Sequence, residues 1–203
     1  VQNSNNTIGF NNGTSFSCPN MAGLASCLWQ GFPEFNNMKI ANALRLAGSI
    51  ASAPNDRIGF GVPDVKKALV ELLNDFSTAN GSIATCSVTI NWNSKDADAM
   101  KYEVERKLPG ETVYTKVKDQ PGTGGVIFSN KSYTFNETLT NAAAGTAVYR
   151  IRQVVDTAAA SFTASNIDSV SLVIGAACNT TGINPPNPNK EKVTLIPNPF
   201  AGT

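Results

Sequence analysis

"CSVTINW", residues 86–92, decides the fold of the second half of this 203-residue chain. Apolar side chains alternate with small polar ones along the whole stretch: Cys86, Val88, Ile90 and Trp92 against Ser87, Thr89 and Asn91. Successive side chains of a β-strand point to opposite faces, so this alternation predicts a strand with one face on a core.

Five further stretches alternate in the same way, and Gly, Pro, Asn and Asp residues separate them. They are Met100–Glu105, Val113–Val117, Tyr133–Phe135, Tyr149–Arg152 and Val170–Ile174. Several short strands with one apolar face each are typical of two packed antiparallel sheets. We therefore expect an all-β sandwich over residues 78–176.

The first part of the chain has a helical period instead. Apolar residues recur at helical spacing in three groups: Met21, Leu24, Ala25 and Leu28; Ile40, Ala43, Leu44 and Ala47; Val65, Ala68, Leu69 and Leu72. This spacing predicts three helices. Ser17 is the expected N-cap of the first helix, and Asn36 or Asn37 that of the second.

The bulk composition excludes several classes of partner. The net charge is +1 and only 15% of the residues are charged, so no basic surplus indicates nucleic acid binding. The longest apolar runs, Leu24–Trp29 and Leu172–Cys178, are far shorter than the ~18 residues of a membrane span. No spacing of candidate ligands predicts a metal site or a cofactor.

The stretch "NNGTSFSCPNMAG", residues 11–23, carries the main functional signal. Gly13-Thr14-Ser15, followed by Pro19 and the pair Ala22-Gly23, resembles the nucleophile segment of the subtilisin-like serine proteases. "IGFGVPDVKKAL", residues 58–69, resembles the closing glycine-rich segment and last helix of that family. The resemblance covers residues 1–75 and implies that Ser15 is the catalytic nucleophile. The alternative is an ordinary helix-capping motif.

A serine nucleophile needs a base, and this chain contains no histidine. In the family that the chain resembles, the catalytic Asp and His and an oxyanion Asn all precede the serine. The Asn-rich start of the chain has no signal peptide and looks like a cut inside a larger protein. We therefore expect residues 1–77 to be the C-terminal, mainly helical part of a three-layer α/β/α catalytic domain, inactive without its missing N-terminal part. A helix separated from its domain should expose apolar residues around Met21, Leu24, Leu28 and Trp29.

The remaining segments resemble two other families. Trp92, Tyr102 and Tyr149 match the core aromatics of fibronectin type III-like sandwiches, a resemblance that covers residues 82–176. Residues 177–203 are a Pro- and Asn-rich linker ending in "VTLIPNPF", which resembles the onset of a type IX secretion sorting domain. This resemblance implies a protein that is secreted or held at the cell surface.

Cys86 begins the first clear strand, and Cys178 lies just beyond the last one. Since the first and last strands of such a sandwich can end near one another, we expect a disulfide between them. Two free thiols are the alternative.

Two functions remain open at this point. The first is a fragment of a secreted serine endopeptidase that cleaves protein or peptide substrates through an acyl-enzyme on Ser15. The second is a non-catalytic surface binding or adhesion module with a vestigial protease-like part.

Overall fold

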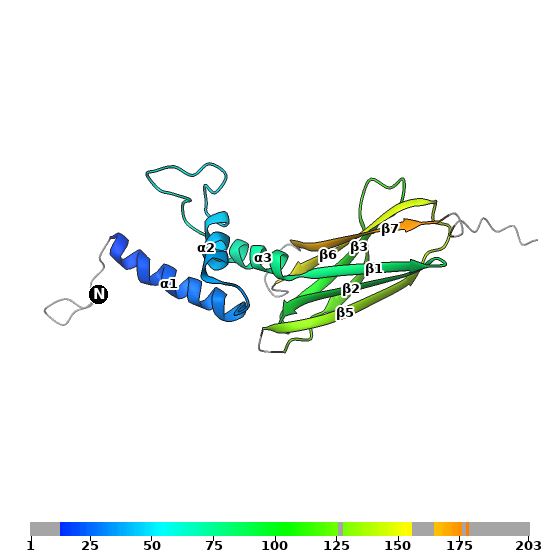
Figure 1. The fold of residues 1–203 in the computed structure, drawn as a ribbon, viewed down its shortest axis with the longest axis horizontal. Helices are drawn as coiled ribbons and strands as arrows, with labels where there is room; N and C mark the ends of the chain where they lie inside the picture. The colour runs from blue at the N-terminus through cyan, green and yellow to red at the C-terminus, as the bar shows by residue number, and fades with distance from the viewer. Residues whose placement is uncertain (1–12, 126–127, 156–164, 176–177, 179–203) are drawn as a thin grey trace, which may run out of the picture.

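The computed structural model describes residues 13–125, 128–155, 165–175 and 178, and within them three helices precede seven strands (Figure 1). The helices are α1 (Thr14–Gly31), α2 (Asn37–Leu46) and α3 (Val65–Phe76). The strands are β1 (Thr78–Ala84), β2 (Ser87–Asp96), β3 (Lys101–Lys107), β4 (Thr115–Pro121), β5 (Ser129–Thr138), β6 (Gly145–Val154) and β7 (Ser165–Ile174).

The strands form two antiparallel sheets, in the orders β1-β2-β5 and β4-β3-β6-β7. The inward side chains predicted by the alternation are buried between them, with Trp92, Tyr102 and Tyr149 at most 2% exposed. The ring of Trp92 lies 5.7 Å from that of Tyr102 and 5.3 Å from that of Tyr133, so aromatic contacts cross the core. The expected pair of antiparallel sheets is therefore present in this part of the chain.

The fold class predicted for the chain as a whole is wrong. We expected residues 1–77 to be a fragment of an α/β/α domain, but α1, α2 and α3 have no strand among them. Strands in two antiparallel sheets make up most of the regular structure in the described residues, and the helices are short. A helical period shows that a helix has an apolar face, but it does not show which kind of layer covers that face.

Two elements differ from their sequence-based limits. Residues 78–84 lie within the expected sandwich, but the alternation identified no strand there; they form β1, and two of its three inward residues, Ala79 and Gly81, are small. A Cβ at Gly81 would lie 2.7 Å from the Ile90 side chain, so glycine permits the close packing of β1 on β2. Val113 was expected within a strand but precedes β4 and is 72% exposed.

The helix ends follow capping chemistry in two of three cases. The Asn36 side chain caps α2 by accepting a hydrogen bond from the Lys39 amide at 2.9 Å, as predicted. Asp64 caps α3 in the same way. The prediction for Ser17 is wrong, because α1 already begins at Thr14 and Gly13 occupies its N-cap position.

Helix α3 packs against one end of the sandwich and leads into β1 through Ser77 (Figure 1). Leu72 and Leu73 of α3 are fully buried there. Phe32, just after α1, lies within 6.1 Å of the rings of Phe35, Phe76 and Phe128. An aromatic cluster therefore joins the helical region to the sandwich.

The predicted disulfide is confirmed. Cys86 and Cys178 are bonded, with their Cα atoms 5.1 Å apart, within the range that disulfide geometry requires. Cys86 belongs to the two-residue turn between β1 and β2, in which Thr85 and Cys86 have φ angles of 45° and 69°. The bond thus ties the end of the described chain to the β1–β2 turn.

Candidate functional site

Ser15 lies in the first turn of α1, and its side chain is exposed. The turn is closed by a hydrogen bond from the Phe16 amide to the Gly13 carbonyl at 3.1 Å. The first amides of a helix have no partner within the helix, and the helix dipole adds partial positive charge beside them. No acidic residue in the first turn offsets that charge. Ser15 therefore stands where backbone donors can stabilise a nearby anion.

This local geometry is not sufficient for catalysis. Among the described residues, no side chain forms a hydrogen bond with the Ser15 hydroxyl, and the sequence contains no histidine that could act as its base. The hydroxyl of an unassisted serine stays protonated at neutral pH and is a poor nucleophile. The arrangement supplies a candidate nucleophile and helix-end donors, and leaves the base to be supplied from elsewhere.

The second segment of the protease resemblance, residues 58–69, forms a loop and the start of α3. Asn55 and Gly59 form an isolated antiparallel bridge, as do Gly48 and Pro63. The Ser49 hydroxyl accepts a hydrogen bond from the Val62 amide at 3.1 Å. Gly61 has a φ angle of 83°, a conformation in which glycine is favoured. The glycine-rich segment is thus an ordered turn between α2 and α3.

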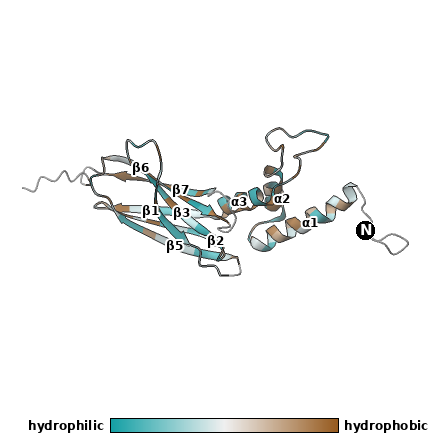
Figure 2. Cartoon of the chain, turned by 180° about the vertical axis from the view of Figure 1, so that it is seen from behind, coloured by the Kyte–Doolittle hydropathy of each residue, from teal (hydrophilic) through white to brown (hydrophobic). Residues whose placement is uncertain are grey.

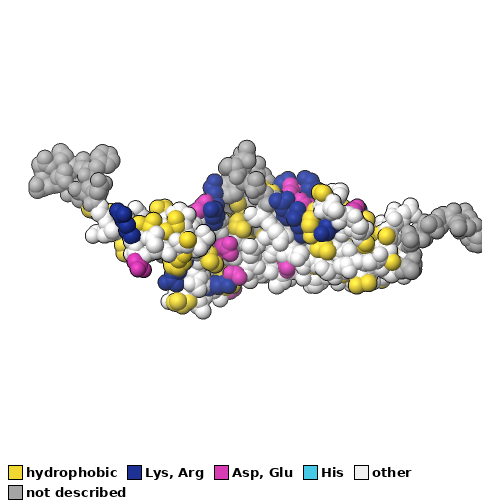
Figure 3. Space-filling view, turned by 90° about the horizontal axis from the view of Figure 1, so that it is seen from above, with side chains coloured by type: hydrophobic (Ala, Val, Ile, Leu, Met, Phe, Trp, Pro, Cys, Tyr) yellow, Lys and Arg dark blue, Asp and Glu magenta, His cyan; other side chains and the backbone are white. Residues whose placement is uncertain are grey.

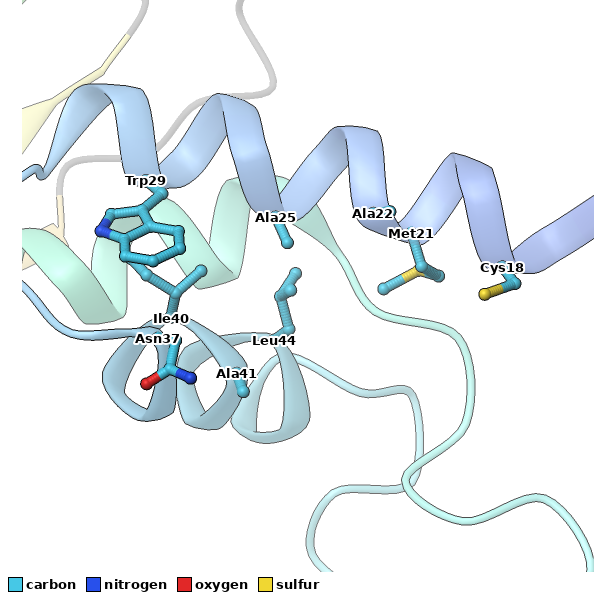
Figure 4. Close-up of a pocket in the computed structure, with 9 residues that line it drawn as sticks. All are labelled: Cys18, Met21, Ala22, Ala25, Trp29, Asn37, Ile40, Ala41 and Leu44. Atoms are coloured by element: carbon cyan, nitrogen blue, oxygen red, sulfur yellow. The ribbon is translucent and has the colours of Figure 1, made fainter.

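A groove of about 370 Å³ separates α1 from α2, and its lining is almost wholly apolar. Figure 4 shows Trp29 and Ala25 of α1 meeting Ile40 and Leu44 of α2, whereas Met21 lies further along α1. Hydrophobic residues run along both helices outside the sandwich (Figure 2). The groove is open along α1 beyond the region where the two helices touch.

The exposed apolar surface predicted for α1 is confirmed in part. Trp29 is 45% exposed and Phe16 is 42% exposed, while Met21 and Leu24 are half-buried. Leu28 is only 5% exposed, and it is the one buried residue of α1. An 18-residue helix with a single buried side chain gains little free energy from packing, so most of α1 lacks a covering surface.

In the described residues, no group of three or more His, Cys, Asp or Glu side chains lies close enough together to hold a metal ion. None of the described helices has the length and apolar character needed to cross a bilayer. Cys18 and Cys27 of α1 are unbonded and exposed.

Comparison with known proteins adds no relative. No protein-family model matches this chain, and no curated protein matches it.

Proposed function

We propose that this chain is the C-terminal portion of a secreted, subtilisin-like serine endopeptidase that forms its acyl-enzyme on Ser15. The observation that carries the proposal is the position of Ser15, exposed in the first turn of the 18-residue helix α1 and preceded by Gly13-Thr14. A nucleophile there would have helix-end amides beside its oxyanion. Its substrates would be proteins or peptides.

The same proposal accounts for the uncovered groove between α1 and α2. The missing part of the catalytic domain would supply the Asp, the His and the oxyanion Asn, and would also cover apolar side chains such as Trp29 and Met21. In this proposal the sandwich is a fibronectin type III-like module, and the tail is the onset of a type IX sorting domain. Both assignments rest on sequence resemblance, and they imply a parent protein that lies outside the cell or at its surface.

The test is active-site labelling of the intact parent protein with a fluorophosphonate probe, which reacts only with activated serines. We expect labelling that Ser15→Ala abolishes while folding persists. Ser17→Ala is the matched control, because Ser17 lies in the same exposed stretch of α1 and should leave labelling unchanged. The isolated 203-residue chain should not be labelled, since loss of the catalytic histidine alone lowers the turnover of subtilisin by a factor of about 10⁶.

The rival function is a non-catalytic surface binding or adhesion module. It is favoured by one observation: no described side chain forms a hydrogen bond with the Ser15 hydroxyl. A folded parent that fails to react with the probe, or an upstream sequence without the Asp, His and Asn, would establish this rival. Labelling that survives Ser15→Ala would show that a different serine is the nucleophile.

A further inference from the structure

The outer surface of the three-stranded sheet has an unusual composition. Apart from the end row of Lys95 and Asn130, where Lys95 is buried against the helical region, its side chains are the alternate residues of β1 from Thr78 to Ala84, of β2 from Ser87 to Asn93 and of β5 from Ser132 to Thr138. The strand register sets them in four rows of three, such as Asn80, Asn91 and Thr134. We call these twelve residues the neutral face. Eleven of them are Asn, Ser or Thr, and the twelfth is Ala84.

The absence of charge on the neutral face is unexpected. At the usual share of 25–35% charged residues, about three or four of twelve surface positions should carry a charge. Many of the charges of the sandwich lie on the other sheet, where ion pairs link Glu103, Glu105, Lys116, Asp119, Arg150 and Arg152. Figure 3 shows such charged side chains gathered over one side of the sandwich. A partner would therefore meet uncharged polar side chains on the neutral face and charged side chains on the other sheet.

The neutral face is also an ordered set of hydrogen-bonding groups. Thr134 donates to the Asn91 side chain at 2.8 Å, and Asn91 donates to Asn80 at 3.3 Å. One row further along, Thr89 donates to Asn136 at 2.8 Å. These contacts hold the amides in place across three strands. Each amide has two donor hydrogens and an acceptor oxygen, so capacity remains for an outside partner.

Charge and polarity together select the class of that partner. Nucleic acids and anionic membranes need basic side chains, and the neutral face has none. Protein interfaces draw most of their binding energy from Trp, Tyr and Arg, whereas Ser and Thr are under-represented among their hot spots. A polymer rich in hydroxyl groups and free of charge matches both the hydrogen-bonding groups and the neutrality.

We propose that the neutral face binds a neutral polysaccharide. The polymer lies across the strands, and its hydroxyl groups exchange hydrogen bonds with the amides and hydroxyls of β1, β2 and β5. Individual contacts are weak, because each replaces a hydrogen bond to water. A repeating polymer engages many copies of the protein along its length, which raises the effective concentration at the surface. This inference does not depend on the function proposed for Ser15.

The test is affinity electrophoresis of the full 203-residue chain in native gels that contain a soluble polysaccharide. The neutral probes are dextran, a mixed-linkage β-glucan and a glucomannan, and the anionic probes are heparin and polygalacturonate. We expect retardation by at least one neutral polymer. This retardation should persist in about 1 M salt, because the neutral face contributes no charge to be screened.

Paired variants connect the retardation to the neutral face. Asn80→Ala with Thr134→Ala removes two exposed hydrogen-bonding side chains beside Asn91, and should weaken binding about tenfold. Ser169→Ala with Ser171→Ala is the matched control on β7, where both serines are also exposed, and should leave binding unchanged. Circular dichroism and a thermal melt establish that both variants are folded.

Three results would overturn the proposal. The first is the absence of retardation by every neutral polymer. The second is retardation by a neutral polymer that the Asn80 and Thr134 variant leaves intact. The third is a dimer in sedimentation equilibrium that this variant dissociates, which would assign the neutral face to a second copy of the chain.

Discussion

The ammonium group of Lys95 donates a hydrogen bond to the carbonyl oxygen of Gly31 at 2.7 Å and so joins β2 to the last residue of α1. The same group lies 2.8 Å from the Glu34 carboxylate and about 5 Å from the ring centres of Phe32 and Phe76. The Lys95 side chain is only 5% exposed. Its hydrogen bond holds the pKa of Glu34 below the ordinary value. A single buried cation therefore fastens the helical region to the sandwich.

Replacing Lys95 should weaken the contact between the helical region and the sandwich and so lower the stability of the protein. Lys95→Met keeps most of the aliphatic stem but removes the ammonium contacts with Gly31 and with the two phenylalanine rings. We expect a loss of about 2–4 kcal/mol in the free energy of unfolding, measured by urea denaturation. Lys118→Met, at an exposed position of β4, should change stability by less than about 0.5 kcal/mol. Equal losses in the two variants would contradict a special role for Lys95.

Protonation of the Glu105 carboxyl should lower the stability of the folded protein in acid. Burial by itself raises the pKa of this carboxyl, but hydrogen bonds from Arg152 and Arg150 outweigh it and leave the pKa below the ordinary 4.5. The folded protein thus binds this proton less tightly than the unfolded chain does. The resulting stability is present above pH 4.5 and is lost as the pH falls through the lowered value.

Denaturation at several pH values between neutrality and strong acid measures this contribution. Glu105→Gln should lower stability at neutral pH by about 1–3 kcal/mol, because two arginines lose a charged partner. It should also flatten the acid part of the profile. An unchanged profile in this variant would show that other carboxyls control the acid response.

The disulfide should make a large contribution to stability. It joins residues 92 positions apart, and the chain-entropy model gives about 4–5 kcal/mol for a loop of this length. Cys178→Ser should lower the free energy of unfolding by up to that amount. Thiol titration of the native protein provides the direct check: two groups should react, the exposed Cys18 and Cys27, and three in the variant. Four reactive thiols in the unmodified protein would disprove the bond.

The first helix should be the least protected element of the described chain. Only Leu28 of α1 is buried, whereas β2 lies at the centre of its sheet with Val88 and Ile90 fully buried. Local opening is easiest where few apolar contacts oppose it. Hydrogen exchange followed by mass spectrometry should therefore show fast exchange over residues 14–27 and slow exchange over residues 88–92. Comparable protection of both segments in the isolated chain would count against an uncovered α1.

The sheets were predictable because strand alternation is imposed by the two faces of a sheet. Val88, Ile90 and Trp92 had to point one way, and the structure buries all three. The strand β1 was not identified because two of its three inward positions, Ala79 and Gly81, hold small residues that give no clear apolar alternation. Gly81 permits close packing against Ile90, which no local pattern reveals. The helical spacing of the apolar residues predicted the three helices, but it did not predict what packs against them. The spacing shows that a helix has an apolar face, and it carries no information about the layer that covers that face.

The two candidate sites, Ser15 and the neutral face, also differ in how much of each could be predicted from the sequence. The expected N-cap of the first helix was Ser17, whereas α1 begins at Thr14, so Ser15 lies in its first turn. The base that Ser15 would need has no signal in this sequence. The neutral face could not be recognised from sequence alone. Its rows exist only through the register that sets Asn80 beside Asn91 and Asn91 beside Thr134, and β5 lies about forty residues from β2 along the chain.

The bond between Cys86 and Cys178 also determines how the sandwich would carry a mechanical load. Tension applied between α3 and the chain beyond Cys178 enters at Thr78, runs along β1 to Cys86 and leaves through the sulfur atoms. Residues 87–177 lie outside this covalent path, so pulling cannot extend them while the bond is intact. The sandwich is then a stiff coupling, and reduction of one bond would make about ninety residues extensible.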